Sequence, residues 1–246
     1  MGRFNGKRIL ITGGTAGIGL AGAKRIAEEG GEVVITGLNP ERLAEAKNTL
    51  PSCSHVVKND ACDPRAADDL AASVKQLGAL DGLWLNAGFA AVRSVYETDA
   101  DFFDRMMNTN VRGPILQMAR LSSLLNTGAS VVLTSSTAAY EGSALASVYA
   151  ATKGAMISLA RCWTSALAPQ SIRVNAIVPG AIGTNFRDFM PEDLRARFEA
   201  DVIGRTPLRR VGSPEEAAAV ALFLLSDDAA FVTGSQYAVD GGLAML

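Results

Sequence analysis

Lys7-Arg-Ile-Leu-Ile-Thr-Gly-Gly-Thr-Ala-Gly-Ile-Gly19 is the stretch from which the fold follows. Its first part, Lys7 to Thr12, is a short apolar run that ends in glycines, which is typical of a buried strand. A helical pattern follows from Ile18 to Glu29 and closes at Gly30 and Gly31. The stretch therefore predicts a strand, a tight turn and a helix in succession.

The same alternation continues along the chain. Near-continuously apolar strands that alternate with helices predict a parallel sheet covered on both faces, and right-handed crossovers then give a doubly wound, Rossmann-type α/β fold of about seven strands. No Pro- or Ser-rich linker and no repeat interrupts it, so residues 1–246 are expected to form a single domain. Further strands are expected at 32–36, 55–59, 83–85, 130–134, 172–178 and 236–239, and helices at 40–50, 64–77, 101–125, 148–168 and 214–225.

Composition narrows the class of protein. The 246 residues are 48% hydrophobic and 20% charged, which allows a sizeable core, and the net charge of −2 gives no electrostatic case for nucleic acid or an anionic membrane. Apolar runs such as 220–225 are far shorter than the roughly 20 residues that span a bilayer, and no secretion leader precedes Arg3. We therefore expect a cytoplasmic protein.

The cysteines and the histidine argue against a metal centre. Cys53, Cys62 and Cys162 lack metal-type spacing and are interpreted as reduced thiols. His55 is the only histidine and stands at the start of an expected strand, where a structural role is favoured. We expect neither a bound metal nor a histidine-based triad.

The turn after the first strand has the composition of a phosphate-binding site. Gly13, Gly17 and Gly19 let the backbone turn tightly and approach a ligand, and the free N–H groups of the following helix favour a pyrophosphate. The spacing Thr-Gly-x-x-x-Gly-x-Gly differs by one glycine position from the usual G-x-G-x-x-G. A plain tight turn is the alternative.

A second motif, Ser147-Val-Tyr-Ala-Ala-Thr-Lys153, can carry acid–base chemistry. Tyr149 and Lys153 are four residues apart and lie on one face of a helix. A phenol titrates near ~10, but an adjacent ammonium favours the phenolate and lowers this value. The pair could then exchange a proton near neutral pH. A packed tyrosine beside a surface lysine is the alternative.

Together these motifs resemble the short-chain dehydrogenase/reductase (SDR) family of the classical type, and the resemblance covers essentially the whole chain. It is carried, in order along the sequence, by Thr12-Gly13 with Gly17-Ile18-Gly19, Asn86-Ala-Gly88, Asn110, Ser136, Tyr149 with Lys153, and Pro179-Gly180. The resemblance implies an NAD(P)(H)-dependent oxidoreductase that interconverts a ketone or aldehyde and an alcohol by hydride transfer, as a carbonyl reductase or alcohol dehydrogenase.

The resemblance also implies catalytic roles. Tyr149 would be the general acid/base, while Lys153 would lower its pKa and hold the nicotinamide ribose. Ser136, 13 positions before the tyrosine, would hydrogen-bond the substrate oxygen. Ser135 would face the other way on a strand. Asn110 would help to organise a water that leads to the lysine.

Further positions would hold the cofactor by the same resemblance. Asp60 would reach the adenine, with a solvated turn aspartate as the alternative, and Thr184 would touch the carboxamide, with a helix N-cap as a compatible alternative. The implied cofactor-binding set is Gly13, Thr15, Gly17, Ile18, Gly19, Leu38, Asp60, Asn86, Gly88, Tyr149, Lys153, Pro179, Gly180, Ile182 and Thr184.

The end of the second strand bears on which nicotinamide cofactor is used. An acid there would bond a free 2′-hydroxyl, whereas an arginine would pair with a 2′-phosphate. Gly37 stands where NAD-selective relatives usually carry the acid, and Leu38 where many NADP-selective relatives carry arginine. Because the absent carboxylate permits a phosphate, and Arg42 could reach it, we expect NADP(H) to be preferred over NAD(H).

Residues 185–204 correspond to the family's variable substrate lid. Phe186, Phe189, Met190 and Phe198, with Phe89 and Tyr140, would form an apolar wall suited to a hydrophobic ketone or secondary alcohol, although such a set could equally be core. A 3-oxoacyl-carrier-protein reductase is the alternative activity, which basic residues at the mouth would favour, and a non-catalytic nucleotide-binding protein is a further one. The arginines in question are Arg187, Arg195, Arg197, Arg209 and Arg210, which a solvated face would also explain.

The family generally forms tetramers, and a homotetramer is expected here. Met156, Leu159, Trp163 and Leu167 form a stripe at helical spacing that is either core or interface. The segment 231–239 is apolar enough to pack against another subunit.

Overall fold

Seven parallel strands form one sheet in the order β3-β2-β1-β4-β5-β6-β7, as the sequence predicts. This computed structural model describes residues 2–245, apart from the side chain of Arg187. The order reverses between β1 and β4, the switch point at which doubly wound sheets bind ligands. The strands are β1 (Arg8–Ile11), β2 (Glu32–Gly37), β3 (His55–Lys58), β4 (Leu80–Leu85), β5 (Leu125–Thr134), β6 (Arg173–Pro179) and β7 (Gln236–Val239).

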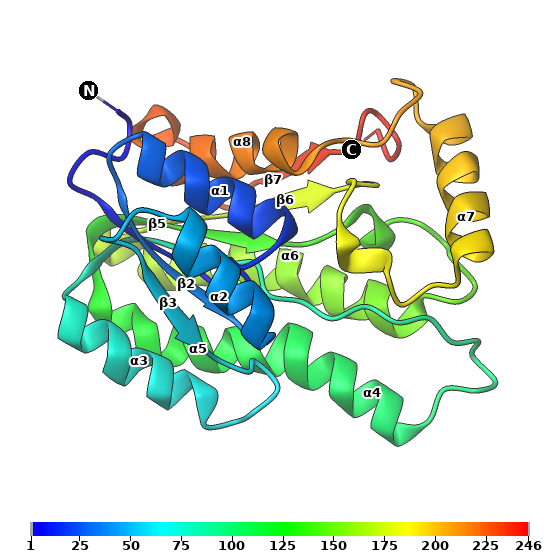
Figure 1. Ribbon diagram of the computed structural model, residues 1–246, viewed down its shortest axis with the longest axis horizontal. Coiled ribbons are helices and arrows are strands. Elements are labelled where there is room, and N and C mark those ends of the chain that lie inside the picture. The colour runs from blue at the N-terminus through cyan, green and yellow to red at the C-terminus, as the bar shows by residue number, and fades with distance from the viewer. Residues whose placement is uncertain (1, 246) are drawn as a thin grey trace.

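Helices cover both faces of the sheet (Figure 1). On one face α1 and α8 pack together over a core that includes Ile26, Trp84 and Leu222. On the other face α3, α5 and α6 enclose a core that includes Leu70, Met118 and Met156. The helices are α1 (Gly17–Glu28), α2 (Pro40–Thr49), α3 (Ala66–Leu77), α4 (Ala100–Met107), α5 (Gly113–Leu121), α6 (Ser147–Leu167), α7 (Glu192–Arg205) and α8 (Pro214–Leu225).

The expected helix at 101–125 is interrupted. A π-helical turn, Asn108–Arg112, separates α4 from α5, and a short 3-10 turn ends the segment at Leu124. Pro114 lacks the N–H that an α-helix would direct at the oxygen of Asn110, so the regular ladder cannot continue there. The break places Asn110 in the widened turn, and such turns occur often at functional sites.

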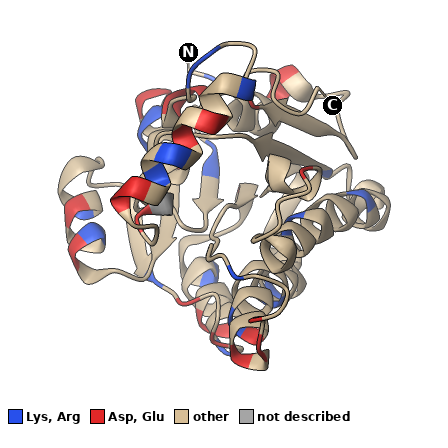
Figure 2. Cartoon of the chain, turned by 90° about the vertical axis from the view of Figure 1, so that its right-hand side faces the viewer, with Lys and Arg blue, Asp and Glu red and all other residues tan. Residues whose placement is uncertain are grey.

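The apolar stripe on α6 lies on the core side of that helix. Met156 and Leu167 are buried, and Leu159 and Trp163 pack against the same core. Charged side chains are spread over the outer helices (Figure 2). In the described residues 2–245, no helix has the length and apolarity needed to cross a membrane.

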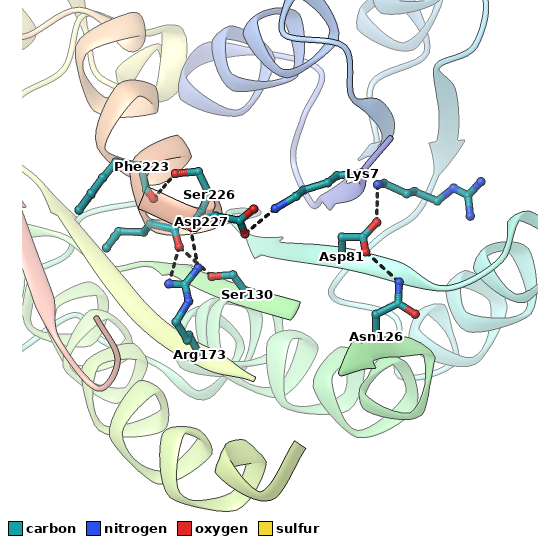
Figure 3. Close-up of polar contacts among 10 residues, drawn as sticks. Lys7, Asp81, Asn126, Ser130, Arg173, Phe223, Ser226 and Asp227 are labelled. Carbon is teal, nitrogen blue, oxygen red and sulfur yellow. Dashed lines mark hydrogen bonds and ion pairs between the residues drawn. The ribbon is translucent and has the colours of Figure 1, made fainter. Parts of the chain in front are cut away.

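A polar network joins the sheet to α8 at the edge opposite the carboxyl ends of the strands (Figure 3). Arg173, on β6, donates to the carbonyl oxygens of Leu224 and Ser226, both at 2.9 Å. The hydroxyl of Ser130 donates to the same Leu224 oxygen at 2.8 Å. These side chains satisfy carbonyls that the end of a helix leaves unpaired. The network therefore fixes α8 on the sheet.

Candidate active site

A cavity of about 600 Å³ opens at the carboxyl ends of the strands. Parallel sheets with a reversal in strand order bind ligands at this edge. Nearly all of the sequence-predicted site residues line it, whereas Gly19 and Asn110 lie just behind the wall. The predicted residues on the wall are Gly13, Thr15, Gly17, Ile18, Leu38, Asp60, Asn86, Gly88, Ser136, Tyr149, Lys153, Pro179, Gly180, Ile182 and Thr184.

The turn between β1 and α1 needs its glycines. Gly13 and Gly17 have φ angles of +65° and +52°, which side-chain-bearing residues rarely adopt. A Cβ on Gly19 would lie 2.5 Å from the Gly13 oxygen. The first turn of α1 can therefore pack this close to the glycine turn only because residue 19 has no side chain. No side chain caps the N-terminus of α1 at Ala16. Gly17 and Ile18, the first residues of α1, line the cavity, so an uncapped helix N-terminus lies where a pyrophosphate could bind.

Asn86, at the end of β4, holds this turn in place. Its amide nitrogen donates to the oxygens of Thr12 and Gly13, both at 3.2 Å. Its amide oxygen accepts from Thr134, which in turn accepts from the indole of Trp84 at 2.9 Å. The glycine turn is therefore tied to two central strands. Asn86 therefore both lines the cavity and fixes the position of the glycine turn that forms part of its wall.

Lys153 and Tyr149 lie side by side in the cavity wall. The Lys153 Nζ is 5.6 Å from the centre of the Tyr149 ring and donates to the main-chain oxygen of Thr134 at 3.0 Å. Burial lowers the pKa of Lys153 to about 8, since the side chain is only 4% exposed. The group is still mainly an ammonium at neutral pH, where it can stabilise a negative oxygen.

Asn110 holds the main chain of Phe89, close to Lys153, through its side-chain amide. Its oxygen accepts from the Phe89 N–H at 2.7 Å, and its nitrogen donates to the Phe89 oxygen at 2.8 Å and to Thr152 at 3.1 Å. A Cβ on Gly88 would be 3.4 Å from the Lys153 Nζ and 3.6 Å from the Asn110 oxygen. The bare backbone at Gly88 therefore leaves room between the amide and the ammonium.

The two serines at the end of β5 have different surroundings. The Ser135 hydroxyl is buried and donates to the main-chain oxygen of Lys153 at 2.7 Å. The Ser136 hydroxyl accepts from the Ala138 N–H at 3.2 Å and lines the cavity. Its position leaves the Ser136 O–H available as a donor toward the cavity.

Two residues combine a local structural role with a place in the wall. The Asp60 carboxylate accepts from the Cys62 N–H at 2.9 Å and closes a turn. Thr184 accepts from the Phe186 N–H at 3.3 Å and caps a 3-10 turn, Asn185–Arg187. The Thr184 methyl also lies 3.1 Å from where a Cβ of Gly17 would be. Both structural alternatives are correct, and neither removes the residue from the cavity.

The apolar part of the wall is smaller than expected. Phe186 lies with its ring centre 6.2 Å from that of Tyr149, and Phe89 also lines the cavity. The other aromatic and Met residues in the expectation, Phe189, Met190, Phe198 and Tyr140, are described but do not line it. Tyr140 instead bonds to Gln236. Most of α7 lies within residues 185–204, and Val202 is the buried residue of that helix.

Some residues of the site carry no recognisable signal in the sequence. Arg105 lies over the Phe89 ring at 4.3 Å and lines the cavity with Thr109. Thr152 and the main chain of Thr134 hold Asn110 and Lys153. Thr152 could be suspected because it stands beside Lys153. A main-chain acceptor has no side-chain signature at all.

Comparison with known proteins assigns the family. A family model described as enoyl-(acyl carrier protein) reductase matches residues 13–244. The chain is 36% identical to the oxidoreductase asL5 of Sarocladium schorii, over 99% of this chain and 98% of that protein. It is 34% identical to the meso-2,3-butanediol dehydrogenase of Serratia marcescens, over 98% and 95% of the two chains. A solved Brucella melitensis structure, described as a glucose/ribitol dehydrogenase, aligns with a TM-score of 0.93 and 32% identity over 100% and 99% of the chains.

The chain belongs to the short-chain dehydrogenase/reductase family, as the motifs predict. It is an oxidoreductase that uses NAD(P)(H) to interconvert a carbonyl compound and an alcohol, and its substrates are small molecules. The glycine turn, the uncapped helix and the buried lysine fit a nicotinamide dinucleotide.

Proposed function

We propose that Tyr149 is the general acid/base of this enzyme. The observation that carries this assignment is the buried Lys153 ammonium beside the Tyr149 ring, in a cavity that also contains Ser136. A cation removed from solvent favours the phenolate more strongly than a hydrated one. Lys153 thus stabilises the tyrosinate when an alcohol is oxidised.

Each remaining member of the set has its own part in the mechanism. A nicotinamide held in this cavity would supply the hydride or accept it. In the direction of reduction, Ser136 and Tyr149 donate hydrogen bonds to the carbonyl oxygen and stabilise the negative charge that develops on it. Tyr149 then gives up its proton. Lys153 positions the ribose, and Asn110 fixes the backbone around Gly88 and Phe89.

The matching experiment removes only the phenolic hydroxyl. Tyr149→Phe is expected to lower kcat by about 100- to 10,000-fold, while the Kd of the dinucleotide changes little. Steady-state turnover and fluorescence titration with NADPH measure the two effects. Turnover near the wild-type level would show that another group donates the proton.

We further propose a preference for NADP(H). Arg42, one turn into α2, lines the cavity beside Leu38, and no carboxylate of the described residues lies within ion-pairing distance of its guanidinium. Gly37 carries no side chain that could repel a phosphate. A guanidinium without an acidic partner supports recognition of the 2′-phosphate. Binding of NADPH and NADH to the same preparation tests the preference directly.

The remaining proposals concern substrate, assembly and location. A hydrophobic ketone or secondary alcohol fits the walls made by Phe186 and Phe89 better than a sugar phosphate does. A carrier-linked 3-oxoacyl substrate has less support, because Arg195, Arg197, Arg209 and Arg210 do not line the cavity, and Arg195 and Arg210 pair with Asp188 and Glu216. The side chain of Arg187 lies outside the described part. We also propose one domain over residues 1–246 with a lid at 185–204, a homotetramer, and a cytoplasmic location. Light scattering tests the tetramer.

A further inference from the structure

The end of β2 meets the phosphate turn at Gly37 and Thr15. A Cβ built on Gly37 would lie 2.4 Å from the Thr15 Oγ1, 2.6 Å from its Cγ2 and 3.0 Å from its Cβ. The φ angle of Gly37 lies outside the left-handed region. The backbone at position 37 would therefore accept a side chain, and Thr15 is what excludes one.

Rotation of the Thr15 side chain does not clear the space. Its Oγ1 and Cγ2 occupy two of the three staggered positions about χ1, and both lie against position 37. Any other rotamer again fills two of the three positions, so at least one of those facing Gly37 remains occupied. The Cβ of Thr15 stays at 3.0 Å in every rotamer.

Nor can the two backbones easily separate. The N–H of Gly14 donates to the Thr36 oxygen at 2.9 Å, and the N–H of Gly13 donates to the Thr36 hydroxyl at 3.3 Å. On the other side, the oxygen of Gly37 accepts from the Asn59 N–H at 3.0 Å. Relief of a clash between positions 15 and 37 would break bonds of the turn or of the sheet.

We propose that Thr15 is a specificity-determining residue of this enzyme because it fills the space that a carboxylate for the ribose 2′-hydroxyl would need. This inference rests on the proposed function, in which the adenosine ribose lies at the end of β2. Positions 15 and 37 then act as one unit. An acid introduced at 37 alone distorts the turn, and it can serve NAD(H) only after the side chain at 15 is shortened.

A double-mutant cycle tests this coupling with two readouts, the Tm of the protein without cofactor and the Kd of NADH and NADPH from fluorescence titration. Gly37→Ala adds only the Cβ and should lower the Tm by about 3 to 10 °C. In the Thr15→Ala background the same change should lower it by less than half as much. Thr15→Gly, which removes the last contact at 3.0 Å, is a second background in which the loss should be smaller still.

The cofactor readout uses Gly37→Asp. Alone it should weaken binding of both dinucleotides, whereas with Thr15→Ala it should shift the ratio of Kd values toward NADH by about tenfold or more. Leu38→Asp is the matched control, since Leu38 is 53% exposed. This substitution should change the Tm by the same amount whether residue 15 is threonine or alanine.

The two readouts separate failure of this inference from failure of the proposed function. Equal Tm losses for Gly37→Ala in all three backgrounds would overturn the role of Thr15, even in an enzyme that binds NADPH normally. A double variant that still prefers NADPH as strongly as the wild type would also overturn it. A wild-type protein that binds neither dinucleotide would refute the proposed function, and the specificity assigned to Thr15 with it.

Discussion

Lys153 and Thr134 are joined by a hydrogen bond of 3.0 Å from the buried ammonium to a main-chain oxygen at the end of β5. A second bond, from the Ser135 hydroxyl to the Lys153 oxygen, runs in the opposite direction at 2.7 Å. Both bonds connect one residue of α6 to the end of one strand. The position of the cation beside Tyr149 is thus set by the contact between β5 and α6.

Because of Lys153, the free energy of unfolding should depend on pH in the alkaline range. Its pKa is about 8 in the folded protein, whereas an unfolded lysine titrates near ~10.4. Between these values the unfolded state binds more protons, so the free energy of unfolding should rise with pH, by on the order of 3 kcal/mol in total. Below pH 8 the buried side chain is charged, so the full desolvation cost lowers the free energy of unfolding. Urea unfolding from pH 7 to 10.5 measures the effect.

Two variants isolate that contribution. Lys153→Met should lose the rise between the two pKa values, whereas Lys24→Met, at an exposed position on α1, should keep it. Parallel pH profiles for the wild type and Lys153→Met would contradict the prediction. The comparison cancels other groups that titrate in the same range.

Asn110→Ala should destabilise the fold as well as the site. It leaves the N–H and the oxygen of Phe89 without their side-chain partner, which costs about 2 to 4 kcal/mol when such groups are buried. Asn108→Ala, in the same π-helical turn, is the control and should cost less than about 1 kcal/mol. Urea denaturation compares the two, and equal losses would show that the amide of Asn110 has no special structural role.

Arg42→Ala should weaken NADPH but not NADH. Loss of a charged hydrogen bond to the 2′-phosphate predicts an increase of about 10- to 100-fold in the Kd of NADPH. Lys47→Ala removes a cation from the same helix at an exposed position away from the cavity, and should leave both Kd values nearly unchanged. An equal loss for NADH after Arg42→Ala would place Arg42 somewhere other than the 2′ position.

Arg173→Met should destabilise the protein through the end of α8. The guanidinium is half-buried and donates to the carbonyls of Leu224, Ser226 and Val232, so its loss should cost about 2 to 4 kcal/mol. Arg161→Met, at an exposed position of α6, is the matched control and should change stability by less than about 0.5 kcal/mol. Thermal unfolding measures both. Similar Tm values for the two variants would argue against the capping role.

The sequence predicts the architecture well where strands are apolar throughout. It misses the beginning of β5 because Asn126, Thr127 and Gly128 are polar or flexible, although β5 begins at Leu125. It also misses the start of β4, whose Leu80 pairs with Leu125. These residues extend the sheet through main-chain pairing, which side-chain patterns do not reveal.

For the site, too, the sequence predicts some features and misses others. The glycines and the Tyr149–Lys153 pair are visible because the chemistry demands those residue types. The π-helical turn at Asn110 could have been expected from Pro114, since proline cannot continue the helical ladder. The apolar lid face expected at Phe189 and Phe198 is not found, because the two side chains are 42% and 39% exposed and do not line the cavity. The sequence of one segment does not tell which of its sides will face a cavity. The roles of the individual residues remain predictions.

The polar contacts around the lysine, the asparagine and the paired serines end largely on peptide groups. Every polypeptide with this fold carries the same peptide groups, whatever its side chains. Proteins that have diverged to about one-third identity, such as the 36% shared with the Sarocladium schorii oxidoreductase, can therefore inherit one geometry while most of their residues change.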